Sequence, residues 1–211
     1  MSEDLSFQNL IAGDYPNTFV DQIVVAANQG ALAKGTVLAR KHLKAGTATL
    51  VAAGTGNGVF TYTGVGNKAK FGSYIVKCIT AASNAGTFSV VDPDGIRLAD
   101  ATVAVAYANQ HLKFTIADGS TDFAAGDYFT VTVVADDDTC VVCLTTNNDQ
   151  TGIPYAILAE AITATAATTT VGIRKGLINS GALVFQTGDT IAKLKDSLEA
   201  IGIYTKTNVA A

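Results

Sequence analysis

The sequence predicts a mainly β protein with one helix near its C-terminus, and three observations support this fold class. Hydrophobic residues make up 48% of the 211 residues and charged residues only 15%, so the chain can form a substantial core. Gly, Ala, Thr and Val are abundant whereas Met occurs once and Trp never, a balance that favours short strands and tight turns. Many short segments alternate apolar and polar residues with a period of two, as half-buried strands do.

Residues 1–18 are expected to form an extended N-terminal arm. Its apolar residues are separated by polar residues and by Gly13 and Pro16, and neither a helical nor a strand period persists. Two interpretations stay open: a frayed terminus, or an arm that becomes ordered only against a partner. The next predicted strands cover residues 19–27 and 36–40.

Residues 45–135 are predicted to form an inserted antiparallel β-sandwich of the immunoglobulin-like kind. Alternating strands are expected within residues 74–79, 88–90, 103–107, 111–116 and 128–133. Asp92–Gly95 has the Pro and Gly of a tight turn, and Asp118–Gly119 fits a hairpin turn that joins two strands. Because this block lies between two predicted strands of another domain, its ends are expected to lie close together.

The chain is expected to return to the first domain at Asp136–Asp138, which we interpret as a solvated, charged linker in preference to a calcium loop. Residues 155–162 and 168–175 are predicted strands, and 182–185 is a short apolar run. A single amphipathic helix follows. Its expected N-cap is Asp189 or Thr190, its apolar stripe is Ile191, Leu194, Leu198 and Ile201, and Gly202 is placed to end it. We expect the stripe to pack on the β domain, with a trimer seam as the alternative.

The charge of the chain argues against nucleic acid as a partner. The net charge is −4, and no cluster of Lys and Arg offers the phosphate neutralisation that nucleic-acid binding requires. No apolar run approaches the length that spans a membrane. The first residues are acidic and lack the basic and apolar regions of a secretion signal, so synthesis and retention in a cytoplasm are expected.

The sequence suggests no catalytic or metal-binding site. Cys140 and Cys143 form a C-x-x-C pair, but a strand over this segment would point the two thiols to opposite faces. A zinc site would also need partners, and the only histidines are His42 and His111. Residues 54–58 (GTGNG) lack the Lys-Ser/Thr of a phosphate cradle and are interpreted as a turn. We therefore expect no enzyme activity, no cofactor and no metal.

Three motifs occur in an order that resembles one known family. They are a G-x-[VL]-L strand at 35–38, the strand Tyr-Ala-Ile-Leu-Ala at 155–159, and the run Thr-Thr-Val-Gly-Ile-Arg-Lys-Gly at 169–176, which apolar residues follow. With the neighbouring segments, this pattern resembles the head decoration protein D family of tailed phages. The resemblance covers the first forty or so residues and about the last seventy. It implies a small β-barrel or β-tulip-like domain made of residues 19–44 and 136–211, interrupted by the insertion 45–135.

The resemblance also implies a function. Proteins of this family are capsid decoration, or cement, proteins that bind the outside of an expanded phage head as trimers at local three-fold positions and stabilise it against DNA pressure. The expected partners are the major capsid protein and two further copies of the chain, and the expected location is the outer surface of the virion. In the family the N-terminal arm lies on the capsid. By analogy, capsid contacts are assigned to Asp14, Tyr15, Pro16 and Phe19.

The same resemblance places the trimer interface on the core strands of the first domain. The residues assigned to it are Tyr155, Ile157, Ile173 and Leu183. The inserted domain departs from the family pattern and would project outward, where it would reinforce its neighbours or weakly bind glycans. The alternative from another class is a carbohydrate- or surface-binding β module of a phage fibre or adhesin.

Overall fold

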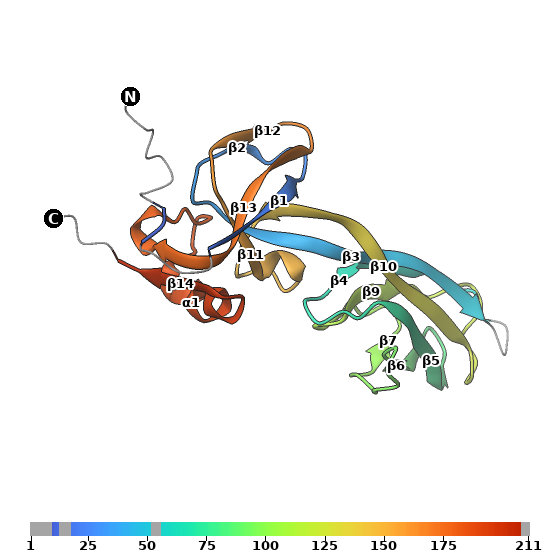
Figure 1. The fold of residues 1–211 in the computed structure, drawn as a ribbon. Coiled ribbons are helices and arrows are strands. Elements are labelled where there is room, and N and C mark those ends of the chain that lie inside the picture. Colours follow the sequence, from blue (N-terminus) through green and yellow to red (C-terminus); the bar gives the residue numbers. More distant parts are fainter. Residues whose placement is uncertain (1–9, 13–17, 52–55, 208–211) are drawn as a thin grey trace, which may run out of the picture. The chain divides into compact units, whose positions relative to one another are not determined.

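The computed structural model describes residues 10–12, 18–51 and 56–207 (Figure 1). Strands account for 53% of the residues, and the described residues contain one α-helix, so the mainly β prediction is confirmed. The chain divides into two compact units: unit 1 is Met1–Lys41 with Asp137–Ala211, and unit 2 is His42–Asp136. The inserted domain expected from the sequence, 45–135, has nearly the same limits as unit 2.

Unit 1 is built around one long strand, β13, which pairs with three others. Its strands are β1 (Phe19–Val25), β2 (Gly30–Leu32), β11 (Pro154–Leu158), β12 (Ile162–Ala164), β13 (Thr168–Asn179) and β14 (Ile203–Lys206), with the first residues of β3 (Val37–Val51) and the last of β10 (Tyr128–Val142). β13 pairs antiparallel with β1 and β11, and in parallel with β14. β11 pairs in turn with β3, and β2 pairs with β12 in a separate two-stranded sheet.

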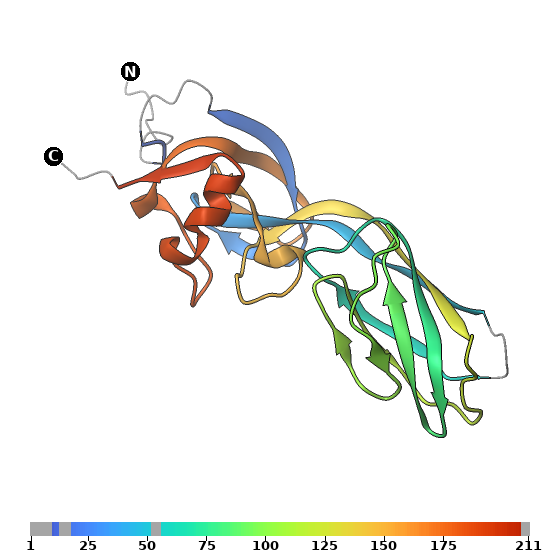
Figure 2. The same cartoon turned by 90° about the horizontal axis from the view of Figure 1, so that it is seen from below.

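The only α-helix that the structure describes, α1 (Ile191–Ala200), lies beside β14 (Figures 1 and 2). It buries Leu194 and Leu198 in the unit 1 core, which confirms the prediction that its apolar stripe packs on the β domain. Thr190 is the N-cap residue, but its side chain makes no capping hydrogen bond. Asp189 instead accepts hydrogen bonds from the backbone N–H and the hydroxyl of Thr145. The described part of the unit also contains the short 3-10 turns Gln150–Gly152 and Ser180–Ala182.

Unit 2 contains two sheets whose side chains share one hydrophobic core. Its strands are β4 (Phe60–Val65), β5 (Gly72–Ala82), β6 (Ala85–Val91), β7 (Ala101–Thr102), β8 (Tyr107–Ala108) and β9 (Leu112–Ile116), with the remaining parts of β3 and β10. One sheet runs β10-β5-β6-β7 and the other β4-β9-β8. Both supply the core, since the alternate residues expected to face inward on β5, β6, β9 and β10 are buried.

Two turns of unit 2 have different outcomes. At Asp92–Gly95 the predicted turn is present: Gly95 has φ of 80°, and Asp92 accepts hydrogen bonds from the backbone N–H of Asp94 and Ile96 at 3.0 and 2.8 Å. Lys70 donates to the second oxygen of Asp92 at 2.5 Å. Asp118–Gly119, by contrast, joins no hairpin, because β9 pairs with β4 and β8 whereas β10 pairs with β5.

The division between the units falls inside two long strands. β3 and β10 each have 15 residues and run from one unit into the other. The interpretation of Asp136–Asp138 as a linker is therefore wrong, since these residues continue β10. Asp138 has φ of 61° and pairs with Arg40 at 3.3 Å. Asp136 pairs with Lys44, also at 3.3 Å. Both aspartates therefore have a cationic partner on β3, which the sequence pattern did not indicate.

Part of the expected N-terminal arm packs on the chain itself. Leu10 is fully buried in the unit 1 core. The N–H of Ala12 donates to the carbonyl of Leu177 at 2.9 Å, and the N–H of Asn179 donates to the carbonyl of Leu10 at 2.8 Å. Neither interpretation of the arm, a frayed terminus or a segment ordered only against a partner, holds for residues 10–12, because Leu10 occupies a position in the core of unit 1.

Candidate functional site

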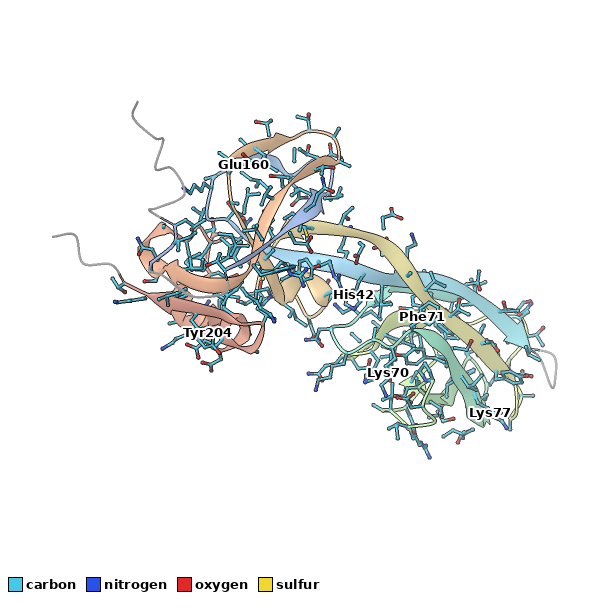
Figure 3. All side chains as sticks on the ribbon, viewed as in Figure 1. His42, Lys70, Phe71, Lys77, Glu160 and Tyr204 are labelled. Carbon is cyan, nitrogen blue, oxygen red and sulfur yellow. The ribbon has the colours of Figure 1, made fainter. Side chains whose placement is uncertain are left out.

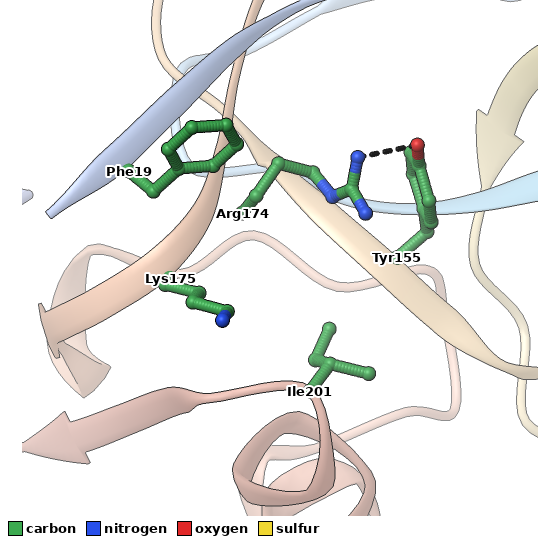
Figure 4. Close-up of a pocket in the computed structure, with 5 residues that line it drawn as sticks. All are labelled: Phe19, Tyr155, Arg174, Lys175 and Ile201. Carbon is green, nitrogen blue, oxygen red and sulfur yellow. Dashed lines mark hydrogen bonds between the residues drawn. The ribbon is translucent and has the colours of Figure 1, made fainter.

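Unit 1 has a surface hollow of about 350 Å³ beside the start of β1 (Figure 4). It is lined by Phe19 of β1, Tyr155 of β11, Arg174 and Lys175 of β13, and Ile201 just after α1. We call these five residues the Phe19 hollow. Two of them are cationic and none is acidic, whereas the rest of the lining is aromatic or aliphatic.

A β-bulge in β13 explains why two consecutive cationic residues line the same hollow. Phe19 pairs with Lys175 and Val20 pairs with Ile173, so Arg174 has no opposite residue on β1. In a regular strand, neighbouring side chains point to opposite faces, whereas a bulge changes the direction of the extra residue. Bulges are over-represented at sheet edges and beside functional sites, and this one lies against an edge strand.

Tyr155 holds two arginines in place. The guanidinium carbon of Arg174 lies 3.7 Å from the centre of the Tyr155 ring, and that of Arg40 lies 4.4 Å from it. Both arginines also donate a hydrogen bond to the Tyr155 hydroxyl. Stacking of a guanidinium on an aromatic ring is favourable by about 0.5–2 kcal/mol, depending on exposure. Arg174 further pairs weakly with the exposed carboxylate of Asp21, at 3.5 Å.

Lys175 is held differently from Arg174. Its aliphatic stem lies against Gly202, since a Cβ added at Gly202 would meet Lys175 Cγ at 3.3 Å. Gly202 has φ of 84°, the left-handed conformation in which helices often end and which glycine adopts without strain. Its lack of a side chain also leaves space for the aliphatic part of Lys175. Among the residues that the structure describes, the Lys175 ammonium has no hydrogen-bond or ion-pair partner.

β1 presents apolar side chains to solvent along an open edge. Phe19 is 52% exposed and Val20 47% exposed, and Val24 is also exposed. From Phe19 to Val24, β1 pairs with β13 alone within the described part of the chain; contact with β10 begins only at Val25, opposite Cys140. Natural proteins usually protect such an edge from pairing with other chains, so an exposed apolar edge indicates an interaction surface.

The structure separates the predicted site residues into three groups. Asp14, Tyr15 and Pro16 lie outside the described residues. Phe19 and Tyr155 lie together in the hollow.

The remaining three, assigned to a trimer interface, are core residues of unit 1: Ile157 and Ile173 are 0% exposed and Leu183 is 8% exposed. They are not at the surface for another subunit to contact, so this assignment is corrected. Their strands were identified, but in a strand the residue that faces the core is fixed by register, which the motif alone does not reveal.

Sequence reasoning missed Arg40, Arg174, Lys175 and Ile201 as site residues. The signal that was present is the Arg-Lys-Gly sequence at 174–176, where two cations interrupt an otherwise apolar and threonine-rich strand. Arg40 and Ile201 gave no such signal, because their proximity to the hollow depends on the pairing of distant strands.

The C-x-x-C pair does not form a site in this structure. Cys140 belongs to the cluster around Val25 and Leu158, whereas Cys143 belongs to the cluster around Leu194 and Leu198. The prediction of opposite faces is thus confirmed. Burial raises the pKa of the Cys140 thiol to about 11 and that of the Cys143 thiol to about 12. Burial also raises the pKa of the Cys78 thiol.

These raised pKa values predict unreactive cysteines, because the thiolate is the form that reacts with electrophiles. At pH 8 the native chain should consume no thiol reagent on the timescale of minutes, whereas the chain in denaturant should consume one equivalent for each of the three cysteines. Spectrophotometric thiol titration of both samples measures this. A fast equivalent in the native chain would contradict the assigned burial.

Other classes of site give no signal in residues 10–12, 18–51 and 56–207. These residues contain no group of three or more His, Cys, Asp or Glu side chains able to hold a metal ion. The described helix is too short to cross a membrane. No protein-family model, no curated protein and no solved structure matches the chain. The Phe19 hollow and the β1 edge are therefore the features on which a functional proposal rests.

Proposed function

We propose that this chain is a phage capsid decoration protein that binds the outside of the expanded head and stabilises it. Three sequence motifs in the order typical of the head decoration protein D family support this proposal, together with a mainly β fold. In finer terms, unit 1 would be the small β-barrel or β-tulip-like decoration domain. Unit 2 would be an inserted immunoglobulin-like sandwich, since its two sheets share one core.

The observation that carries the proposal is the exposed edge of β1 beside the Phe19 hollow, which from Phe19 to Val24 pairs with β13 alone among the described residues. The chain immediately before β1 contains Asp14, Tyr15 and Pro16, the other proposed capsid contacts. The residues that flank this segment lie against neighbouring positions of β13: Ala12 bonds to Leu177, and Thr18 lies against Gly176. The described residues on either side of that segment, Ala12 and Thr18, therefore lie along the same part of β13 as Lys175 of the hollow.

The stabilising effect of such a protein follows from mass action. A protein that binds the expanded lattice but not its loosened form stabilises the former by RT ln(1 + [L]/Kd), about 2.7 kcal/mol per site at a hundredfold excess over Kd. Repeated over a whole shell, this term becomes large. Trimer formation at local three-fold positions would add avidity, and cyclic symmetry would close the assembly. With three of the assigned interface residues buried, contacts between copies would have to come from other, exposed residues of unit 1.

Cosedimentation tests the proposal. The purified chain is mixed with expanded and with unexpanded heads of the phage that encodes it, and the protein in the pellet is measured. We expect saturable binding to expanded heads and little to unexpanded ones. Phe19→Ala should weaken binding, whereas Phe71→Ala should not. Phe71 is the matched control because it is also an exposed phenylalanine, 68% exposed, but belongs to unit 2 (Figure 3).

Equal binding to both kinds of head, or binding to neither, would refute the cement function. Binding to glycan-coated surfaces in place of heads would favour the alternative of a carbohydrate-binding module of a fibre or adhesin. A loss of head binding in Phe71→Ala with none in Phe19→Ala would place the contact on unit 2 and remove the β1 edge from the proposal.

A further inference from the structure

We propose that the Phe19 hollow is a binding site for an acidic peptide segment that carries an apolar side chain next to its carboxylates. That the peptide belongs to a subunit of the capsid shell rests on the proposed function. The existence of the site does not, because it is argued from the charge, shape and packing of unit 1 alone.

The charge of the hollow favours a carboxylate. Among the described residues that line it, the charged ones are Arg174 and Lys175, and both are cationic. Arg174 uses one nitrogen to bond the Tyr155 hydroxyl, and a guanidinium has five N–H donors in all, so donors remain for a ligand. Hydrogen bonds between a guanidinium or ammonium and a carboxylate are about twice as strong as neutral ones.

The chain's own carboxylates compete only weakly for these cations. Asp21 Oδ2 lies 3.5 Å from Arg174, beyond ordinary hydrogen-bond geometry for a charge-assisted pair, and the Asp21 side chain is 47% exposed. No carboxylate within the described chain pairs with Lys175. An incoming carboxylate would therefore gain the Lys175 ammonium without displacing a partner among the described residues.

The walls of the hollow favour an apolar group beside that carboxylate. Figure 4 shows the Phe19 ring and Ile201 on different sides of the hollow, with the Lys175 ammonium between them. A volume of about 350 Å³ is at the small end of the range for ligand pockets, which is suited to one large side chain. Burial of apolar area there contributes about 25 cal/mol per Å², and the charged groups fix the orientation.

The hollow is also organised before any ligand arrives. Arg174 is held by its stacking on Tyr155, and the Lys175 stem is held by Gly202. Side chains that are already ordered lose less entropy on binding, so the same contacts give higher affinity.

The surroundings favour a peptide over a small acid. Beside the hollow, the backbone of β1 from Phe19 to Val24 pairs only with β13 within the described part of the chain. An extended peptide can pair with the other side of this strand while one of its side chains fills the hollow, whereas a small acid cannot. Two cations are too few for nucleic-acid phosphates, whose recognition needs an extended basic surface.

Fluorescence anisotropy with the full chain tests the site. The probe is a labelled peptide with one phenylalanine between two aspartates and glycine at the other positions. Two further probes replace both aspartates with asparagine, or the phenylalanine with alanine. We expect saturable binding of the first probe that weakens with added salt, and at least about threefold weaker binding of each of the other two.

Matched variants locate the binding. Lys175→Gln should weaken the first probe about threefold to tenfold, whereas Lys195→Gln, which removes an exposed lysine of α1, should leave it unchanged. Phe19→Ala should weaken the same probe, and Phe71→Ala should not. All four side chains are exposed or lie at the surface, so thermal melting of each variant close to that of the parent chain verifies that folding is intact.

Four results would overturn the site: no saturable binding, equal binding of the aspartate and asparagine probes, equal effects of Lys175→Gln and Lys195→Gln, or full displacement by low-millimolar inorganic phosphate, which would indicate a simple anion site.

The cosedimentation assay separates the two proposals. Head binding that is insensitive to Lys175→Gln would remove the peptide site from the proposed function, whereas peptide binding without head binding would leave the site and remove the function.

Discussion

Gly35→Ala should destabilise unit 1 by about 3 kcal/mol or more, the largest effect we expect from the addition of a single methyl group. A Cβ at Gly35 would lie 2.0 Å from the backbone carbonyl oxygen of Ala182, a contact that only a shift of the main chain relieves. Gly35 also has φ of 87°, and its N–H and C=O bond to Leu158 and Val184 at 2.8 and 2.9 Å. A shift of the main chain at Gly35 would therefore strain both of these backbone hydrogen bonds at once.

Gly30→Ala is the matched control for this prediction. Gly30 has a similar φ of 70°, but a Cβ there would meet nothing within 4 Å, so only the backbone cost of about 1 kcal/mol is expected. Hydrogen exchange followed by mass spectrometry measures both variants, with peptides from β11 and β13 reporting on unit 1 and those from β5 and β6 serving as the internal reference. Equal effects of the two variants would show that backbone conformation, not the close approach to Ala182, determines the need for Gly35.

Phe88→Ala should destabilise unit 2 by about 3–5 kcal/mol. The Phe88 ring is fully buried and packs edge-on against the Phe123 ring, with 5.1 Å between the ring centres. It also lies 6.1 Å from the Phe129 ring. Removal of the ring loses its burial and both aromatic contacts, and the two sheets that share this core cannot close completely over the cavity.

Exchange rates of β5 and β6 amides report the effect of Phe88→Ala, and Phe71→Ala again provides the control. Phe71 is 68% exposed, so its removal should change the stability by less than about 0.5 kcal/mol. If Phe88→Ala accelerated exchange no more than Phe71→Ala, the core assigned to unit 2 would be wrong.

The strands of this protein could be predicted from sequence because their pattern is local. The period of two placed Tyr74, Val76 and Cys78 on the buried face of β5, and all three are buried. The same reasoning fails within residues 103–107, where a regular strand would bury Val105 together with Val103 and Tyr107, because Val105 is 56% exposed. The chain turns between β7 and β8, where Ala104 has a positive φ of 60°. This turn interrupts the alternation, and it contains neither Gly nor Pro, the residues from which a turn is usually predicted.

The candidate site could be predicted only in part, because it depends on pairings between distant segments. The family resemblance assigns Phe19 to a capsid contact and Tyr155 to a trimer interface, whereas in the structure both residues line one hollow. What joins them is the register of β1 and β11 on β13, together with a bulge at Arg174. Neither register nor bulge position follows from a period of two, and a shift of one residue would reverse every side chain.

The two long strands that contain the division between the units have an evolutionary consequence. β3 and β10 are neighbours, and on the unit 1 side Arg40 and Asp138 hold them together at 3.3 Å. The polypeptide therefore leaves and re-enters unit 1 at adjacent points that one reverse turn would suffice to connect. We expect that replacement of His42–Asp136 by a short turn would preserve the strand register of unit 1, so that unit 2 could be lost or exchanged in evolution without refolding of unit 1.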